Sequence, residues 1–551
     1  MRIIITCLLL SLGLFVSAQD SSIQKKDLIS SAKLFDLSFT TKEIDTLYSD
    51  VIDNIANFKA MHNLPLANSV PLSMWQTPVL PGMHFNEVQK TILWKLDNTV
   101  QLPANKNELA FYSIEQLASL IKNKKISSLA LTQFFIARIK KWGDTLQCVI
   151  SIQEDMAYAQ ARKADAELAQ GKYRGLLHGI PYGLKDLFAV KGTKTTWGAA
   201  PYQNQVIDED AFVYTKLKEA GAVLVAKFTL GALAMGDYWF GGRTKNPWNL
   251  NYGSSGSSAG SASATVAGLV PFAIGTETWG SIVSPSTTCG ATGLRPTFGS
   301  ISRTGAMALS YSLDKVGPIC RSAADAAVVF NYIHGTDGKD GSAVNKPFNY
   351  TPNKDIKKLK IAYAKNYFDK IKDTSRNEFK VLEEFRKLGV QLIPVNFPDS
   401  GVYNFNIMDV VIGVECAAQF DEMTRLNIDD VLTRQAKNDW PNQFRTARFV
   451  PAVEYINAQR HRYTLMQKVN EVMQQYDVII CPSRGDRNQS AITNLTGNPV
   501  VCVPTGFDKK FNLPTGISFV GNLYDEATIL SIAQAFQKAT IWEEAHPARF
   551  K

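Results

Sequence analysis

The distribution of small, apolar and polar residues changes abruptly within one stretch of the chain, Gly253 to Pro285. Its first half, Gly253 to Gly268, consists of Gly, Ser and Ala apart from Thr265 and Val266. The second half begins with an apolar run, Leu269 to Ile274, which predicts a buried strand. A flexible linker would have polar neighbours, so we expect these small residues to pack closely against the strand.

Upstream of that stretch, segments whose apolar residues are spaced as on one face of a helix precede segments typical of buried strands. Ser113 to Leu117 predicts the start of a helix. Apolar residues spaced to lie on one face of a helix predict two further helices, over Ser127 to Ile139 and Ala157 to Leu168. Apolar runs within Gly175 to Phe188 and Gly221 to Phe228 then predict two buried strands.

Downstream, the same alternation continues to the end of the chain. Strands are predicted at 359–364, 390–395, 476–482 and 500–506, with helices at 376–387, through most of 405–475, and after Asp525. Strands alternating with helices predict an α/β fold.

The N-terminus has the pattern of an export signal. Met1 and Arg2 are followed by an apolar run from Ile3 to Val16 and then by small residues, which predicts a secretory signal peptide over residues 1–18. The run is short for a membrane span, and Cys7 lies inside it, so we expect neither a lipoprotein anchor nor stable membrane insertion after removal of the signal. The mature protein is therefore predicted to be exported, to the periplasm or the medium.

Residues 19–107 form a lead segment with no recognisable chemistry. Ser38 to Glu43 predicts the start of a helix, and prolines further along predict irregular structure. We expect a mainly helical lead segment, followed by a catalytic domain over residues 108–545.

Composition and charge exclude several functional classes. The chain has 551 residues, 45% of them hydrophobic, and a net charge of +9 that is dispersed along the sequence. There is no basic patch with interleaved aromatic residues, so no nucleic-acid partner is expected. The cysteines are scattered without a CxxC pair, which favours buried thiols over a zinc or redox site.

Three residues suggest chemistry. Ser257 opens the Ala-rich run, where a helix N-terminus would expose main-chain N–H groups, and Ser281 lies in a turn after the predicted strand. Lys185 ends an apolar strand, which is a costly place for an ammonium group. From the residue alone, the favoured interpretation is a lysine whose ammonium group either reaches solvent or is paired with Asp186.

The stretch around these serines resembles the amidase signature family, whose pattern is a Gly-Gly-Ser-Ser-Gly-Gly-Ser block followed by Gly-Thr-Asp-x-Gly-Gly-Ser-Ile. Ser257 lies 24 residues before Ser281, which is the family's spacing, whereas Ser254 lies 27 residues before it. The matching block is therefore Gly256 to Ser261. Gly179 to Asp186 occupies the place of the family's lysine strand, and the resemblance runs from about residue 112 to 540.

The resemblance implies a mixed central β-sheet covered by helices on both faces. It also implies that Ser281 is the nucleophile, that Ser257 relays its proton after a cis peptide with Gly256, and that Lys185 is the base. An oxyanion hole is implied at the main-chain N–H groups of Thr278, Trp279, Gly280 and Ser281. The expected substrate is a small-molecule carboxylic amide, hydrolysed without a cofactor or metal.

Departures from the family pattern leave alternatives open. Trp279 and Val283 stand where the family often has Gly and Arg, and Ala259 replaces a Gly, so an esterase or a non-catalytic binding protein on the same fold remains an alternative. None of the six histidines lies in a convincing catalytic motif, which disfavours a Ser-His-Asp hydrolase. Within the family, the signal peptide disfavours an aminoacyl-tRNA amidotransferase subunit.

Overall fold

The computed structural model of the chain describes residues 23–63, 67–70, 73, 76–399, 403, 405–483 and 488–551. The predicted signal peptide, residues 1–18, lies outside the described residues. The chain forms two compact units, Met1–Ala67 and Asn68–Lys551.

The smaller unit contains two helices that contact each other, α1 (Lys25–Leu34) and α2 (Thr41–His62). Thr40 caps α2, because its hydroxyl accepts from the N–H of Glu43 while the Glu43 carboxylate accepts from the N–H of Thr40. The helix predicted from Ser38 to Glu43 is thus confirmed.

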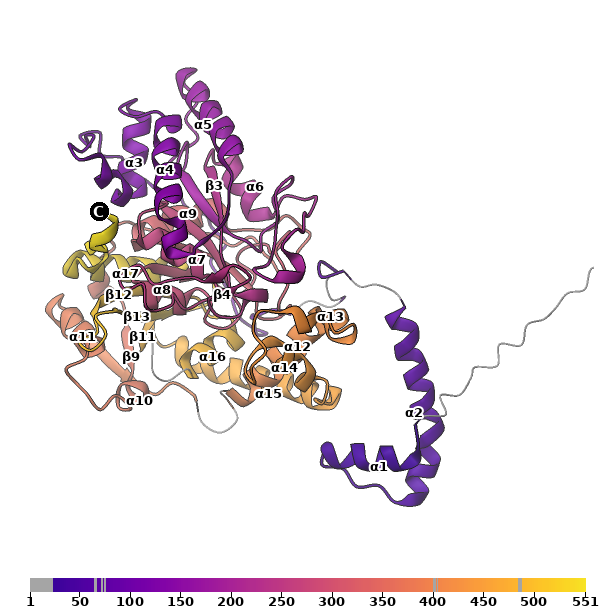
Figure 1. The fold of residues 1–551 in the computed structure, drawn as a ribbon. Helices are drawn as coiled ribbons and strands as arrows, with labels where there is room; N and C mark the ends of the chain where they lie inside the picture. The colour runs from indigo at the N-terminus through magenta and orange to yellow at the C-terminus, as the bar shows by residue number, and fades with distance from the viewer. Residues whose placement is uncertain are drawn as a thin grey trace, which may run out of the picture. The chain divides into compact units, whose positions relative to one another are not determined.

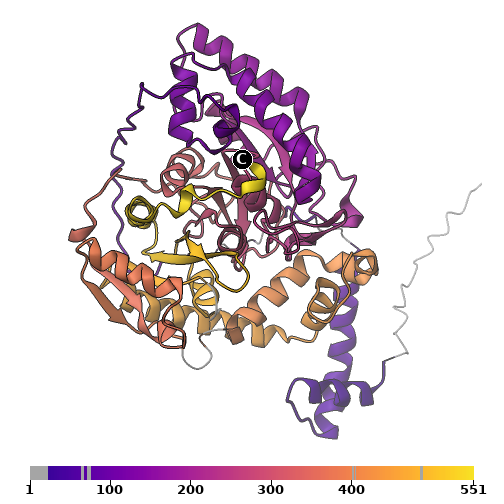
Figure 2. The same cartoon turned by 60° about the vertical axis from the view of Figure 1, so that its left-hand side comes forward.

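The larger unit is organised around one mixed sheet, with helices on both sides of it (Figures 1 and 2). The strand order is β1-β3-β2-β6-β8-β7-β12-β13-β11-β9-β10. Pairs β2–β3, β2–β6, β9–β11 and β9–β10 are parallel, and the other pairs are antiparallel. The strands are β1 (Val149–Ile152), β2 (Pro181–Lys185), β3 (Val223–Phe228), β6 (Phe272–Glu277), β7 (Thr292–Arg295), β8 (Lys315–Cys320), β9 (Ile361–Ala364), β10 (Leu392–Val395), β11 (Val478–Pro482), β12 (Val500–Phe507) and β13 (Pro514–Gly521). A separate hairpin pairs β4 (Tyr238–Trp239) with β5 (Gly242–Arg243).

The helices of this unit connect and cover the strands. They are α3 (Ile114–Lys122), α4 (Ser128–Leu146), α5 (Glu154–Ala169), α6 (Phe212–Glu219), α7 (Ala259–Val266), α8 (Val283–Cys289), α9 (Ala323–Ile333), α10 (Lys365–Phe368), α11 (Asn377–Lys387), α12 (Phe405–Gln419), α13 (Asp421–Arg425), α14 (Trp440–Ala447), α15 (Ala452–Met473), α16 (Asn488–Thr496) and α17 (Glu526–Thr540). Helices α9, α11 and α17 contact strands of the sheet, as do α7 and α8.

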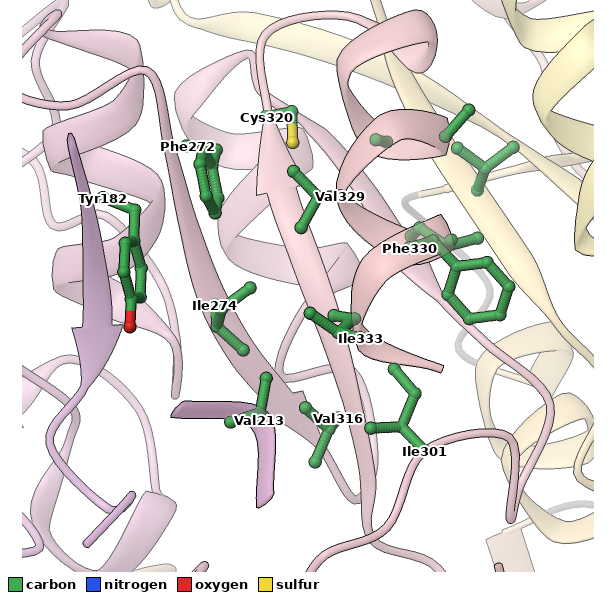
Figure 3. Packing of buried hydrophobic residues seen from close by; sticks show 14 of the residues in the cluster. Tyr182, Val213, Phe272, Ile274, Ile301, Val316, Cys320, Val329, Phe330 and Ile333 are labelled. Atoms are coloured by element: carbon green, nitrogen blue, oxygen red, sulfur yellow. The ribbon is translucent and has the colours of Figure 1, made fainter. Parts of the chain in front are cut away.

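Strand residues alternate between two apolar clusters, which explains why the strands read as nearly continuous hydrophobic runs. On β12, Val501 and Val503 belong to the cluster that includes α9 and α17, whereas Val500 and Cys502 belong to the cluster that includes α15 and α16. Figure 3 shows the first cluster between the sheet and α9, where the rings of Tyr182 and Phe272 stack 5.4 Å apart. The predicted mixed sheet with helices on both faces is confirmed.

Two sequence predictions need correction. The strand predicted at 269–274 is β6, which begins at Phe272 and continues to Glu277; Leu269 to Pro271 connect it to α7. The lead segment is helical only in its first part, because the described residues between 67 and 105 contain no helix. Pro78, Pro81 and Pro103 interrupt that part, and each lacks the N–H that a helix interior requires.

Candidate active site

Lys185 ends β2 and is completely buried. Its Nζ donates hydrogen bonds to Ser257 Oγ at 2.8 Å, to Thr276 Oγ1 at 2.8 Å and to Ser258 Oγ at 3.2 Å. Burial lowers the pKa of Lys185 to about 7, although the charges of Asp314 and Glu277 act in the opposite direction. A large fraction of the amine is therefore neutral near pH 7 and able to accept a proton.

Asp186 points away from Lys185, as the alternation of strand side chains predicts. Its Oδ1 forms a buried ion pair with Lys227 Nζ at 2.9 Å, and its Oδ2 accepts hydrogen bonds from the N–H and hydroxyl of Thr196. The Lys185–Asp186 pair that the residue type alone favoured is therefore wrong. Asp186 is compensated by another lysine, which leaves Lys185 facing hydroxyl groups.

The small residues before α7 allow close contact between main chains. The Gly256–Ser257 peptide is cis, and a Cβ on Gly256 would lie 1.9 Å from the carbonyl oxygen of Gly236, so only glycine fits there. Ser258 Oγ donates to the carbonyl of Thr276 at 3.0 Å and accepts from its N–H at 3.1 Å. These bonds fasten the start of α7 to β6 and hold Ser257 against Lys185.

The turn that carries Ser281 follows β6. Gly280 has φ +86°, a conformation that favours glycine, and the N–H of Ser258 donates to the carbonyl of Ser281 at 3.1 Å. Among the described residues, the N–H groups of Gly280 and Ser281 have no hydrogen-bond acceptor, so both donors are available to a ligand. Ser281 is 8% exposed and Ser257 only 1%, which suits an outer nucleophile and an inner relay.

Glu277 and Asp314 fix the two ends of this turn. Glu277 Oε2 accepts from the N–H groups of Ile282 and Val283, each at 2.9 Å. Asp314 Oδ1 accepts from the hydroxyl of Thr278 at 2.6 Å. The turn is therefore held by carboxylates at both ends, which is how pre-organised main-chain donors are maintained.

Glu277 remains charged although it is buried. Burial by itself would raise the pKa of Glu277, but the adjacent Arg295 guanidinium, the Val283 N–H and the Asn494 amide lower it to about 2. Arg295 Nη1 and Asn494 Nδ2 each donate to Glu277 Oε1 at 2.9 Å. The result is a fixed, compensated charge behind the turn.

The structure brings the predicted residues Lys185, Ser257 and the turn of Ser281 to one place. Sequence reasoning assigned no role to Thr276, Glu277 or Asp314, which orient the lysine and the turn. A carboxylate within an otherwise apolar strand was the available signal for Glu277, because such a group is buried only when it is paired.

Trp279 lies in the same turn and is partly buried. Its indole packs against the cluster that includes Leu313 and residues of α12 and α16, such as Met408 and Ile492. The side chain therefore has a packing role, and its main-chain N–H remains part of the turn.

A cavity of about 290 Å³ adjoins the site. Thr276 and Thr278 lie on one side of it, and its apolar lining includes Leu187, Ala234, Met307 and Val316. A larger cavity of about 470 Å³ lies around Tyr112, Arg321 and His546 and includes none of the predicted site residues. The smaller cavity is therefore bordered by Thr278 of the predicted oxyanion hole, whereas Lys185, Ser257 and Ser281 are not among its lining residues.

Two further findings concern metals and membranes. In the part of the chain that the structure describes, no group of three or more His, Cys, Asp or Glu side chains is arranged to hold a metal ion. Among the described helices, none combines the length and hydrophobicity needed to span a bilayer.

Comparison with known proteins agrees with this architecture. The Amidase family model matches residues 130–530. One subunit of the glutamyl-tRNA(Gln) amidotransferase of Coxiella burnetii is 33% identical over 482 residues, covering 79% of this chain and 99% of that protein. The solved structure of the native peptide amidase from Stenotrophomonas maltophilia is 27% identical, with a TM-score of 0.71 over 81% of this chain and 100% of that one. The corresponding amidotransferase subunit from Thermotoga maritima gives 26% identity and a TM-score of 0.65 over 78% and 95%. The chain therefore belongs to the amidase family of amide-hydrolysing enzymes.

Proposed function

We propose that the protein hydrolyses a carboxylic amide of a small molecule through an acyl-enzyme on Ser281. Ser281 Oγ attacks the carbonyl carbon, and its proton passes through Ser257 Oγ to Lys185 Nζ. Collapse of the tetrahedral intermediate breaks the C–N bond, and the leaving amine takes that proton back through Ser257. Water then cleaves the acyl ester, which releases the acid and restores Ser281.

One observation carries this proposal. The buried amine of Lys185 is 2.8 Å from Ser257 Oγ, and among the described residues it faces hydroxyl and carbonyl oxygens without an ion-paired carboxylate. A structural lysine would be paired and protonated, whereas a proton acceptor requires this neutral environment. The open N–H groups of Gly280 and Ser281 supply the complementary oxyanion donors.

The proposal is tested by reaction with a serine-directed fluorophosphonate and by hydrolysis of matched amides and esters. We expect a single adduct that peptide mass spectrometry maps to Ser281, together with release of amine from at least one amide. An adduct on another serine would refute the assignment of the nucleophile. Turnover of esters with no turnover of the matched amides would favour the esterase alternative.

An amidotransferase subunit is the second candidate, because a relative with 33% identity is such a subunit. The two functions differ in what the isolated chain can do. A hydrolase releases acid and amine by itself, whereas an amidotransferase subunit passes the ammonia onward within an assembly. If the purified chain hydrolyses amides as fast alone as it does with other proteins present, the result favours a hydrolase over an amidotransferase subunit.

Trp279 offers a test of acyl-group size. Trp279→Gly retains the main-chain donor and removes an indole two residues before the proposed nucleophile. If that indole limits the space for the acyl group, relative rates should shift toward bulkier acyl groups. Stability should fall as well, because a large side chain leaves an apolar cluster, at a cost on the order of 3 kcal/mol. A lower melting temperature with unchanged relative rates across an acyl-size series would show that Trp279 serves packing alone.

We also propose that the protein is exported after cleavage near residue 18. The basic start and short apolar run of residues 1–18 support this. N-terminal sequencing of protein from the native source should begin near Gln19. Intact Met1 on protein in the cytoplasmic fraction would contradict export.

A further inference from the structure

Residues from the lead segment form part of the wall of the cavity beside the active site. Asn68, Ser69, Val70 and Gln76, which lie at the start of the larger unit, are among its lining residues. All four precede residues 130–530, the part of the chain that matches the family. This wall is thus a contribution of the chain's own N-terminal extension to the catalytic domain.

Asn68 attaches residues 68–70 to the rest of the larger unit through a pair of hydrogen bonds like those between neighbouring strands. Its Nδ2 donates to the carbonyl of Ala308 at 2.9 Å, and the N–H of Ala308 donates back to its Oδ1 at 2.9 Å. A side-chain amide carries one donor and one acceptor in the geometry of a peptide group, so it can satisfy both main-chain groups of one residue. Ala308 itself lines the cavity, so the attachment point is at the wall.

Gln76 provides a second attachment. Arg462 Nη1 donates to Gln76 Oε1 at 3.2 Å. The same guanidinium donates to the hydroxyl of Ser312 at 2.8 Å and to its carbonyl at 3.0 Å, so its position is fixed. Ser69 and Val70 therefore lie between two anchored residues.

The interior of the cavity suits an apolar group. Several of its charged side chains are already bonded within the protein. Arg303 Nε contacts Asp340 Oδ2 at 2.8 Å, both oxygens of Asp314 accept hydrogen bonds from neighbouring residues, and Lys315 Nζ donates to the carbonyl of Leu313. The other two, Glu209 and Lys339, are exposed to solvent. The rest of the lining is formed in large part by apolar residues, among them Leu187, Met307 and Val316. A volume of about 290 Å³ is at the lower end of ligand-binding cavities, so the group must be compact.

We infer that Asn68 to Val70 form the end wall that limits the size of the apolar substrate group admitted beside Ser281. Asn68 is a specificity-determining residue that acts by holding the wall in place. The inference rests on the proposed function, since it requires substrate to react at Ser281. It identifies the substrate class as amides with a compact apolar group.

The test compares Asn68→Ala with a matched control. Gln89 makes the same pair of bonds to another residue, donating to the carbonyl of Phe348 at 2.8 Å and accepting from its N–H at 2.9 Å, but neither residue lines the cavity. Asn68→Ala should raise kcat/KM for substrates with a long alkyl group, relative to short ones, by roughly tenfold. Gln89→Ala should leave that ratio unchanged.

A third variant works in the opposite direction. Val70→Trp should fill the cavity and lower the same ratio by roughly tenfold, with little effect on the smallest substrate. Because the two variants are expected to move the ratio oppositely, a general loss of folding cannot imitate the result. Two series of substrates should be used, one that varies the length of the acyl group and one that varies the length of the amine group. The series whose rates respond to the variants identifies the group that enters the cavity.

Labelling of Ser281 by fluorophosphonates with methyl or dodecyl chains separates the two possible failures. If Ser281 reacts and amides are hydrolysed, but the long-to-short ratio is the same in all variants, the wall has no role in specificity and this inference is overturned. If Ser281 is neither labelled nor required for hydrolysis, the proposed function fails, and this inference with it. A ratio raised by Asn68→Ala and lowered by Val70→Trp supports both.

Discussion

Lys185→Ala is expected to reduce amide hydrolysis by roughly 10²- to 10⁴-fold, the usual contribution of a positioned acid–base group. The loss should be larger for amides than for activated esters, because an amine leaving group must receive a proton and a stable phenolate need not. In the proposed mechanism the Lys185 amine holds that proton, which it receives through its 2.8 Å contact with Ser257 Oγ.

The pH profile of the wild-type enzyme gives the second part of this test. The reactive form of Lys185 is the neutral one, so activity should rise as pH increases through about 7 and then level off, since burial lowers the pKa of this lysine to about 7. Below that value the rate should fall about tenfold per pH unit. A lysine in water, with a pKa near 10.4, would place the rise more than three units higher.

Lys185→Arg separates charge from proton transfer. Arginine remains protonated in proteins, so it cannot act as a base even where it can donate hydrogen bonds. We expect it to be as inactive toward amides as the alanine variant. An alanine variant with wild-type amide turnover and an unchanged pH profile would falsify the role of Lys185.

Ser281→Ala is expected to abolish turnover, with a loss on the order of 10⁵-fold or more. The substitution removes one hydroxyl from a turn held by main-chain and carboxylate contacts, so the fold and the melting temperature should change little. The measurements are single-turnover acylation and fluorophosphonate labelling, both of which should disappear.

Ser284, in the first turn of α8, provides a matched control three residues after Ser281. It is exposed, and its N–H donates to the carbonyl of Gly280, a contact that alanine retains. Ser284→Ala should therefore keep both acylation and labelling. Residual labelling of the Ser281→Ala protein at the wild-type rate would place the nucleophile elsewhere.

The sequence identifies the proposed reactive residues but not the contacts that orient them. Ser257, Ser281 and Lys185 lie in short patterns whose spacing and surroundings can be read directly, and the fold class follows from alternating strands and helices. The Asp186 side chain could also be placed, because neighbouring residues on a strand face opposite sides. Each of these predictions depends on local order along the chain.

The supporting contacts join residues that are far apart in sequence. Asn494 donates to Glu277 across 217 positions, and Asn68 binds Ala308 across 240. The spacing of residues along the chain does not indicate such distant pairs. An isolated Asn in an irregular segment, such as Asn68, would most often be expected to face solvent. The strand boundary of β6 was also misplaced, since Leu269 and Val270 are as apolar as the strand itself but belong to its connection.

The cysteines have a consequence for handling the protein. None of the six described cysteines forms a disulfide, and all six are buried. Burial raises the pKa of the thiols of Cys148, Cys320, Cys416 and Cys481, which disfavours the reactive thiolate. Folding of the described chain therefore places no demand on the redox state of its surroundings, and we expect dithiothreitol and thiol-alkylating reagents to leave the native enzyme equally active.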